Sequence, residues 1–600
     1  MGGGGISVRK GNPVLKNVMI RNNDTGYMGL GGGVLLGSNS YPTFNNVTIK
    51  DNYAGEIGGG VAIEHDGGAI VFSEEEKSSI YNNNCTYQGK DFYLFGGDEQ
   101  DTVTLEIFTV ANPTVYYFFP LNDRIFDITN SIVNQINGDV YISPYGSNTN
   151  SGLSPELPWK NIDYALQRMY SDSLNPSNIN LANGTYSPNS TNETFPLICT
   201  SFTNVIGENT EEVILNVQSN KRAFLIKNNP GITIESLTVT NASGGGISIG
   251  NSIFNFNNLV INRNETDWYG GGILIAYSEG TIENCKIIDN HATEKGGGIH
   301  VDESNIIIRN SLIEENSSGM LGGGLYFGGF GYDISLEGNT IRFNSAVRGG
   351  GIFLDDDINL TFSIENRVNI YSNYAALGSD LFSSGEVHVV LDTFTVMNPT
   401  DYFATPIEDF SFDINHGLLE KVNADLYVSP FGDNMNDGLT SDTPLQTISF
   451  AYAKMLTDSL HHNSIFLNVG VYSPETNNER YPLQCINKVN LIGSGRDNTI
   501  LVGDRTMKML VIHENDSIRI EGLTVRDGYG DFGACVDIMN SECYFKDIRV
   551  TECQGSNLGG AFFIENSNCS INNSIINKGK VVKEPLNMLT FKLFKNEFFL

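Results

Sequence analysis

Cysteine, tryptophan and positive charge are scarce in this 600-residue chain. Its eight cysteines are too few for a disulfide framework in a chain of this length, and no Cys/His cluster has the spacing of a metal site. The 36 Lys and Arg face 69 Asp and Glu, which gives a net charge of −33. This balance argues against nucleic acid as a partner, because phosphates require clustered Lys and Arg. No apolar run approaches about 18 residues, so no segment is predicted to span a membrane.

Glycine, in contrast, is abundant and regularly spaced. Glycine triplets recur at steps of 26, 26, 26 and 27 residues, beginning at Gly244, Gly270, Gly296, Gly322 and Gly349. Asparagines recur in step with them, each three residues after an isoleucine, at Asn264, Asn290, Asn316 and Asn344. A fixed period of this length indicates one structural unit stacked on itself.

The sequence between the repeated glycines and asparagines consists of short β-rich runs, such as 272–275 and 306–308, without the periodicity of an amphipathic helix. We therefore predict an all-β fold, a parallel β-helix (β-solenoid) with one rung per period. Stacked rungs would align the asparagines, whose amides can hydrogen-bond as a ladder, and glycine would serve corners where φ is positive. Both columns are predicted to be structural.

A longer repeat shows that the chain is a tandem of modules. Residues 108–239 align without a gap onto 394–525 at an offset of 286. The predicted domains are the C-terminal rungs of a first module at 1–107, a complete module at 139–393 (cap 139–175, rungs 176–393), and the start of a third at 425–578 (cap 425–461). Residues 108–138 and 394–424 are predicted inter-module β segments. The tail 579–600 has no repeat, and we expect both chain ends to be artificial.

Each module is predicted to open with one short helix. Ile162, Ala165, Leu166 and Met169 have helical spacing, and the third module repeats it, with Asn161 and Thr447 placed to cap the two helices. Because the first rung of a solenoid exposes unpaired strand edges, this helix is predicted to cover them.

The modules resemble a known superfamily. The sequence resembles large bacterial secreted proteins of the right-handed parallel β-helix, pectin-lyase-like superfamily. The resemblance lies in the entry segments 139–154 and 425–440, the predicted strands at 181–188 and 489–501, and the Gly-Gly-Gly-Ile rungs. The Gly-Gly-Ala-Phe turn at 559–562 resembles polymorphic outer-membrane protein repeats, which occur on surface adhesins. The resemblance implies right-handedness and an extracellular or cell-surface location, although no signal peptide is visible.

This resemblance leaves function open, because one fold hosts many activities. Pectate-lyase-like Trp-x-Asp-His and polygalacturonase-like Gly-His-Gly are absent from the sequence. We therefore expect a non-catalytic adhesin-like or scaffold protein that binds glycans or other surfaces multivalently. The alternative is a polysaccharide lyase or glycoside hydrolase of the same fold. A third hypothesis is a spacer that holds other domains away from the cell and binds nothing. The oligomeric state stays open.

Few residues qualify as candidate sites. Asp289 and Glu315 lie on adjacent rungs, near the roughly 5 Å separation of a retaining glycosidase, but their column continues as Arg263 and Phe343, which favours a solvated face. No cofactor is predicted beyond possible Ca²⁺ ligands, which are Asp355, Asp357, Asp433 and Asp437. For these carboxylates a solvated loop is the favoured reading.

One cysteine pair has the spacing of adjacent rungs. Cys543 and Cys569 lie 26 residues apart with similar flanking sequence, so we expect them to stack within bridging range. A reduced ladder is favoured over a disulfide.

Overall fold

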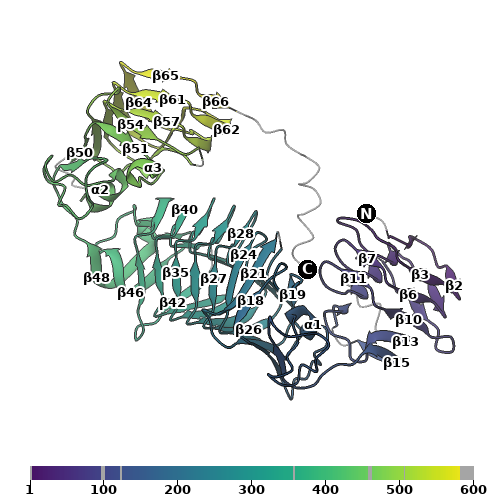
Figure 1. Cartoon of the computed structure of the whole chain (residues 1–600). Helices are drawn as coiled ribbons and strands as arrows, with labels where there is room; N and C mark the ends of the chain where they lie inside the picture. The colour runs from purple at the N-terminus through teal and green to yellow at the C-terminus, as the bar shows by residue number, and fades with distance from the viewer. Residues whose placement is uncertain are drawn as a thin grey trace. The chain divides into compact units, whose positions relative to one another are not determined.

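The computed structural model describes residues 3–65, 67–95, 102–121, 124–219, 221–355, 358–456, 462–505 and 507–581. Short β-strands dominate these residues and pair in parallel with strands of the neighbouring rung (Figure 1). The chain separates into two compact units, Met1–Asn344 with Asp355–Val368, and Ser345–Leu354 with Asn369–Leu600. The predicted parallel β-helix is confirmed, whereas the predicted module boundaries stay predictions.

The first unit begins with a stack of rungs that we call the first stack. Its sheets have the strand orders β1-β4-β8-β12-β14, β15-β13-β10-β6-β3 and β2-β5-β9, and β11 pairs with β7. The strands are β1 Ile6–Val8, β2 Val14–Lys16, β3 Met19–Arg21, β4 Val34–Leu36, β5 Thr43–Asn45, β6 Thr48–Lys50, β7 Tyr53–Ala54, β8 Val61–Ile63, β9 Val71–Phe72, β10 Ser78–Tyr81, β11 Asn84–Cys85, β12 Phe92–Leu94, β13 Thr102–Val110, β14 Phe118–Phe119 and β15 Ile125–Val133.

The same unit continues with the second stack, which has three main sheets. The triplet sheet, named for the glycines that precede most of its strands, contains β19 Leu197–Ile198, β22 Phe224–Lys227, β25 Ile247–Gly250, β29 Ile273–Ala276, β33 Ile299–Asp302 and β37 Leu325–Gly328. The middle sheet contains β16 Val140–Ile142, β17 Ser177–Leu181, β20 Thr203–Gly207, β23 Ile232–Glu235, β26 Ile253–Asn257, β30 Glu279–Glu283, β34 Asn305–Arg309, β38 Asp333–Glu337 and β42 Asn359–Phe362. The ladder sheet, named for the asparagines that follow it, contains β18 Gly184–Tyr186, β21 Val213–Ser219, β24 Thr238–Ala242, β27 Val260–Asn262, β31 Lys286–Ile288, β35 Leu312–Glu314 and β39 Thr340–Arg342. Short strands β28 Glu265–Thr266, β32 His291–Ala292 and β36 Ser317–Ser318 complete the rungs.

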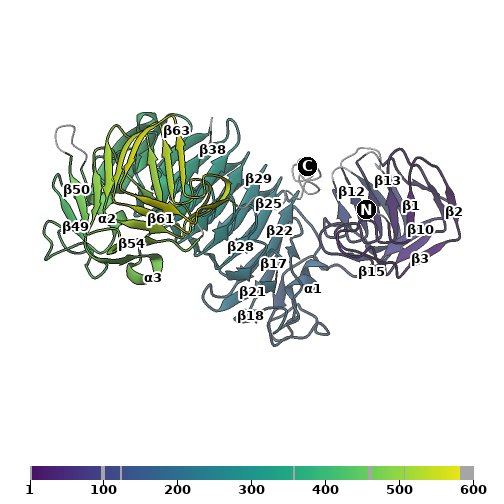
Figure 2. The same ribbon diagram turned by 90° about the horizontal axis from the view of Figure 1, so that it is seen from above.

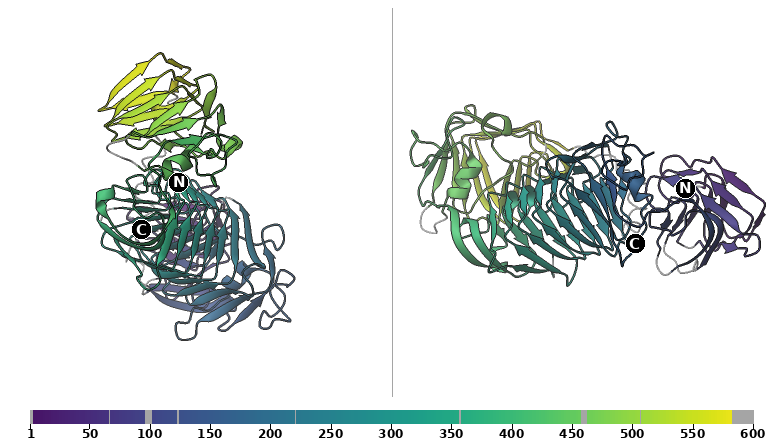
Figure 3. Two further views of the ribbon diagram at one scale, coloured as in Figure 1. Left: turned by 90° about the vertical axis from the view of Figure 1, so that its left-hand side faces the viewer. Right: turned by 60° about the horizontal axis from the view of Figure 1, so that its bottom comes forward.

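The second unit contains further rungs and then the third stack, drawn in green to yellow in Figure 3. The rungs before that stack are β40 Ser345–Arg348, β41 Ile352–Leu354, β43 Val368–Tyr371, β44 Tyr374–Leu377, β45 Leu381–Ser383, β46 Val387–Val396, β47 Ala404–Thr405, the 3-10 turn η1 Ile407–Asp409 and β48 Phe410–Leu419. The third stack contains β49 Leu426–Val428, β50 Ser464–Leu467, β51 Gly470–Tyr472, β52 Leu483–Gln484, β53 Asn490–Gly493, β54 Thr499–Val502, β55 Leu510–His513, β56 Ile518–Glu521, β57 Thr524–Arg526, β58 Tyr529–Phe532, β59 Val536–Met539, β60 Glu542–Lys546, β61 Arg549–Thr551, β62 Gln554–Leu558, β63 Phe562–Glu565, β64 Asn568–Asn572, β65 Ile575–Asn577 and β66 Lys580–Val581.

Aliphatic columns form the core of the second stack, whose strands lie side by side in successive rungs (Figure 2). Ile261, Ile287, Ile313 and Ile341 are register partners along the ladder sheet, and each is fully buried. At every rung the isoleucine of the ladder-sheet strand points inward. The column therefore removes a continuous strip of apolar surface from water.

The asparagine column lies directly beside this core. Asn264 donates its side-chain amide to Oδ1 of Asn290 at 3.0 Å, Asn290 donates to Asn316 at 2.9 Å, and Asn316 donates to Asn344 at 3.0 Å. Each backbone N–H donates to the same oxygen, and all four asparagines are buried. The ladder therefore satisfies polar backbone groups at a turn that water does not reach.

A second ladder of serines was not foreseen. The backbone N–H of Ser252 donates to Oγ of Ser278 at 3.1 Å, and that of Ser278 donates to Oγ of Ser304 at 2.9 Å. All three serines are buried at the turn between the triplet sheet and the middle sheet. In the rungs that contain Ser252, Ser278 and Ser304, two turns are thus stabilised by stacked polar side chains.

Glycine fills a corner that other residues resist. Gly270, Gly296, Gly322 and Gly349 have φ values of 65°, 64°, 64° and 63°. A Cβ on Gly296 would approach the Ile299 carbonyl oxygen to 2.6 Å, so this position excludes a side chain on two grounds.

The two predicted capping helices are present as α1 Ile162–Leu166 and α2 Ile448–Lys454, and a short α3 spans Pro474–Asn477. Thr447 caps α2 as predicted, accepting from Phe450 N–H at 3.2 Å. Asn161 occupies the N-cap position of α1 as predicted, but its side chain makes no cap hydrogen bond.

Buried glutamates supply the acceptors at both helices. Glu193 accepts from the N–H groups of Ile162 and Asp163 at 2.9 Å each, and Glu479 accepts equivalent bonds at 2.7 and 3.0 Å at the start of α2. A carboxylate with two acceptor oxygens satisfies two unpaired N–H groups at once.

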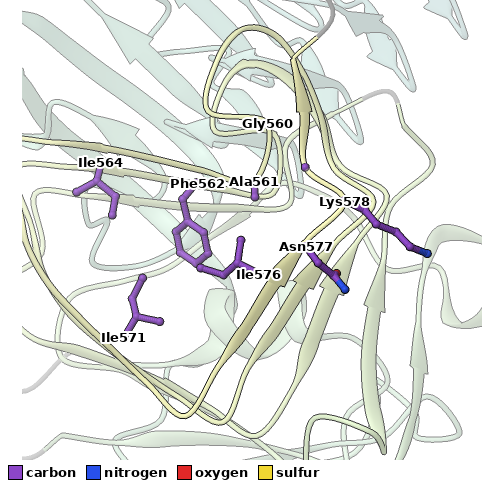
Figure 4. Close-up of a pocket in the computed structure, with 9 residues that line it drawn as sticks. Gly560, Ala561, Phe562, Ile564, Ile571, Ile576, Asn577 and Lys578 are labelled. Carbon is purple, nitrogen blue, oxygen red and sulfur yellow. The ribbon is translucent and has the colours of Figure 1, made fainter.

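Apolar side chains line a hollow at the last described rung of the third stack (Figure 4). Phe562, Ile571 and Ile576 surround it, and Ile576 is 49% exposed. This hollow lies inside the β-helix at its last described rung. No helix in the described part of the chain is long and apolar enough to cross a membrane.

Candidate binding face

Aromatic rings stack on the outer face of the triplet sheet in the second stack. His300 of β33 and Tyr326 of β37 are register partners, and their ring centroids lie 4.6 Å apart with planes 7° from parallel. On the other side of His300, the ring of Tyr269 lies 4.9 Å away at 15°. The rung spacing of ~4.8 Å is close to a ring-stacking distance, so three successive rungs form one aromatic stack.

A lysine and a carboxylate join this stack through the tyrosine hydroxyl. Lys295 donates its ammonium to Tyr326 Oη at 3.0 Å, and Tyr326 Oη donates to Asp355 Oδ2 at 2.7 Å. The Lys295 ammonium also lies 4.6 Å from the Tyr326 ring centroid, a cation–π contact. A Cβ on Gly328 would lie 3.0 Å from Tyr326 Oη and 3.1 Å from Asp302 Oδ1. These polar groups therefore converge above Gly328.

Burial sets the charges of this cluster. It lowers the pKa of His300 to about 3, helped by Lys295 and Arg222, so the imidazole is neutral at ordinary pH. Burial, together with Asp355, raises the pKa of Tyr326 well above its usual value. Burial and Glu303 also raise the pKa of Asp302. A neutral imidazole and a protonated phenol suit stacking and hydrogen bonding better than general-base chemistry near neutral pH.

An exposed tryptophan flanks the stack. Trp268 is 59% exposed and directly precedes Tyr269. Tyr269, Lys295 and Leu321 are bridge partners on successive rungs. The residues preceding them, Trp268, Glu294 and Met320, therefore form a parallel column at the same turn. We call the outer face of the triplet sheet with this turn the aromatic face.

The two candidate catalytic carboxylates, Asp289 and Glu315, are not part of the aromatic face. Asp289 and Glu315 occupy left-handed turn positions with φ of 55° and 56°, as do Arg263 and Phe343 at 52° and 56°. Asp289 is exposed and lies 3.6 Å from the Arg263 guanidinium. Their arrangement is that of a solvated turn column, and whether they act in catalysis stays untested.

The acidic entry loop is closed by its own hydrogen bonds. Asp433 accepts from Met435 N–H at 2.9 Å, and Asp437 accepts from Leu439 N–H at 3.1 Å and Thr443 Oγ1 at 2.7 Å. The ammonium of Lys454 donates to the Asp437 carbonyl at 2.9 Å, so an internal cation already contacts this loop.

The other two candidate calcium ligands are Asp355 and Asp357. Asp355 hydrogen-bonds to Tyr326, and Asp357 lies outside the described residues. Within the described ranges, no group of three or more His, Cys, Asp or Glu side chains is arranged to hold a metal ion.

The cysteines differ from expectation in one respect. Cys543 and Cys569 are register partners of β60 and β64 and are free thiols in the structure; the preference for a reduced ladder over a disulfide stays a prediction. A disulfide instead joins Cys535 to Cys553, with their Cα atoms 5.7 Å apart. Sequence reasoning missed this pair because the two cysteines lie 18 residues apart, which is not the rung period.

Sequence reasoning also missed the aromatic face. Tyr269, Lys295, His300 and Tyr326 do not repeat one residue type from rung to rung, so no column in the sequence marks them. Their only signal is position, because Tyr269 and Lys295 directly precede a glycine triplet, and His300 and Tyr326 directly follow the first strand residue after one.

Comparison with known proteins bears on the fold. Residues 222–394 match the family model described as "Right handed beta helix region", and a search of curated proteins finds no match. Among solved structures, the surface adhesin PfbA of Streptococcus pneumoniae is 13% identical, with 69% of this chain and 88% of that chain covered and a TM-score of 0.24. The PL6 family alginate lyase AlyGC is 10% identical, with 96% and 82% covered and a TM-score of 0.15. The family match identifies residues 222–394 as a right-handed β-helix region, and the parallel rungs described above show that the fold is an all-β parallel β-helix.

Proposed function

We propose that this chain is an extracellular, non-catalytic β-helix protein that binds glycan chains along the aromatic face of its second stack. The observation that carries the proposal is the exposed Trp268 beside the Tyr269–His300–Tyr326 stack. The exposed Trp268 ring presents an apolar surface for the C–H face of a sugar, whereas His300 and Tyr326 are buried and support the face from within. Nearby Lys295 and Asp302 offer hydrogen-bonding partners for hydroxyls.

Rung geometry supports an extended ligand. Successive rungs are ~4.8 Å apart, which is close to the length of one pyranose unit, so a glycan chain lying along the stack would meet a similar turn at each sugar. Repeated weak contacts of this kind sum to useful avidity without a deep pocket. The Cys535–Cys553 disulfide supports an oxidising, extracellular environment.

Binding is tested with the full chain on a glycan array, followed by titration calorimetry with the best ligand. Trp268→Ala should weaken binding about tenfold or more, because the largest exposed ring of the face is lost. The matched control is Tyr145→Ala, which removes an aromatic ring that is 92% exposed on an entry loop. Equal affinity of the Trp268 variant and the parent chain, or no binding to any glycan, would overturn the proposal.

A catalytic role is the second candidate, and the Lys295–Tyr326–Asp355 hydrogen-bond chain favours it. Tyrosine and lysine can act as acid and base in polysaccharide cleavage. Incubation with polygalacturonate, alginate and chondroitin decides the question. Unsaturated or reducing ends that vanish in Tyr326→Phe would establish an enzyme on this face, and loss of activity in Asp289→Asn or Glu315→Gln would place the chemistry on the turn column instead.

A further inference from the structure

The Cys535–Cys553 disulfide occupies a place in the third stack that a glycine and a ladder asparagine occupy in the second stack. Cys535 directly precedes β59, as Gly246 directly precedes β25. Cys553 lies two residues after β61, as Asn264 lies two residues after β27. The cysteines are 18 residues apart, and the numbers 264 and 246 also differ by 18.

The contact that the disulfide replaces is visible in the second stack. A Cβ on Gly246 would lie 3.3 Å from the side-chain nitrogen of Asn264, and a Cβ on Gly272 would lie 3.2 Å from that of Asn290. Each ladder asparagine therefore packs against the third glycine of a triplet. Two cysteines at these positions place their sulfur atoms in the gap that the amide otherwise fills.

The amide ladder is interrupted at this point of the third stack. In the second stack, Asn264 accepts from the N–H of Ala242 at 3.1 Å and donates onward to Asn290. The positions next to Cys553 in its column are Gly528 and Gly579, at the same offset from their strands. Glycine has no side-chain acceptor, so an amide ladder cannot run through Cys553.

We infer that the disulfide is the covalent substitute for the asparagine ladder, and that the third stack reaches full stability only after oxidation. The oxidant we name is a small-molecule disulfide such as oxidised glutathione. The thiolate of one cysteine attacks it to form a mixed disulfide, and the second thiolate then displaces the bound thiol. The two cysteines are oxidised to one S–S bond, and the reagent is reduced to two thiols that take up both protons.

Because folding and oxidation would be linked, the stability of the third stack would depend on the redox state of its compartment. In a reducing compartment the third stack would lack both the ladder and the bridge beside β59 and β61. After export to an oxidising compartment the bridge would close the 18-residue loop and lower the entropy of the unfolded stack. This inference is independent of glycan binding.

Hydrogen exchange of the full chain, followed by mass spectrometry with and without reductant, tests the idea. Reduction should speed amide exchange in β59 and β61 by about 100-fold, in line with a bridge across a loop of this size. Strands β25 and β27, which have the asparagine ladder, serve as the internal control and should not change. Equal exchange of β59 and β61 under both conditions would overturn the inference.

Two double variants separate the ladder from a general loss of packing. Cys535→Gly with Cys553→Asn recreates the Gly246–Asn264 contact without the onward amide bond, because position 579 is glycine, so its exchange should be insensitive to reductant and slower than that of a variant without the amide. Cys535→Ser with Cys553→Ser removes the bridge without restoring the amide, and should exchange as fast as the reduced parent. Fast exchange in both variants, or a non-reduced peptide map that pairs Cys535 with another cysteine, would also overturn the inference.

Discussion

Asn83 donates both its backbone N–H and its side-chain amide to a single oxygen of Asp91, at 3.0 and 2.9 Å. In the second unit, Asn373 makes the same two bonds to Asp380, at 3.1 and 3.0 Å. An amide ladder donates in one direction, so its last asparagine needs an acceptor that is not another amide. A buried carboxylate meets this need at Asn83, which accepts from Asn52 in the preceding rung, and buried Asp380 accepts the same pair of bonds from Asn373.

The Asp91 carboxylate is predicted to make stability depend on pH. Burial raises its pKa from 3.8 to about 7, so the folded chain holds the proton more tightly than the unfolded chain. This group therefore contributes most stability below about pH 4, and the contribution is lost as pH rises towards 7. Each pKa unit corresponds to about 1.4 kcal/mol.

Thermal melts of the parent chain and of Asp91→Asn between pH 4 and 8 measure this effect. The difference between the two should change with pH over that window, because asparagine does not titrate. Asp127→Asn is the control, since its side chain is 57% exposed. A parent-to-variant difference that is constant from pH 4 to 8 would contradict the assignment.

Breaking the ladder at its centre should be costly. Asn290 makes buried bonds to Asn264, Asn316 and the carbonyl of Ile261. Asn290→Ala leaves several of these groups without partners, so we expect a loss of about 3 kcal/mol in the free energy of unfolding. Urea denaturation measures it. The control Asn189→Ala removes an exposed amide bond of 2.8 Å and should cost less than about 0.5 kcal/mol; similar losses in both would refute a structural ladder.

The glycine corner allows an equally direct test. In Gly296→Ala the new Cβ would approach the Ile299 carbonyl oxygen at a φ of 64°, so we expect a loss of about 2 kcal/mol or more in unfolding free energy. Gly385→Ala is the matched control, because no atom lies within 4 Å of its added Cβ. Denaturation midpoints that fall equally for both variants would show that steric crowding at Gly296 is not decisive.

Residues that repeat at every rung were accessible to sequence reasoning, and single contacts were not. Asn264 and Asn290 could be placed in one column because stacking puts equivalent positions above one another. Glu193 contacts α1 from about 30 residues away, and this contact does not recur in successive rungs. Cys535 is bonded to Cys553, which lies three strands further along the chain. His300 lies between two tyrosines only because neighbouring rungs differ in residue type. Contacts between residues that repeat with the rung period are therefore predictable from the sequence, whereas contacts between residues that break the period become visible only in the structure.

Buried Glu193 should hold the cap helix in place. It accepts from Ile162 N–H and Asp163 N–H, and burial raises its pKa to about 7. Glu193→Gln keeps one acceptor oxygen but sets an amide N–H₂ against the second donor, so we expect a loss of about 1–3 kcal/mol. Hydrogen exchange should then rise in α1 and in β16 and β19, which α1 contacts, while β33 and β37 stay protected. Glu156→Gln, at a fully exposed carboxyl, is the control. Unchanged protection of α1 in the Glu193 variant would mean that the hydrophobic contacts of Ile162 and Leu166 hold the cap without the carboxylate.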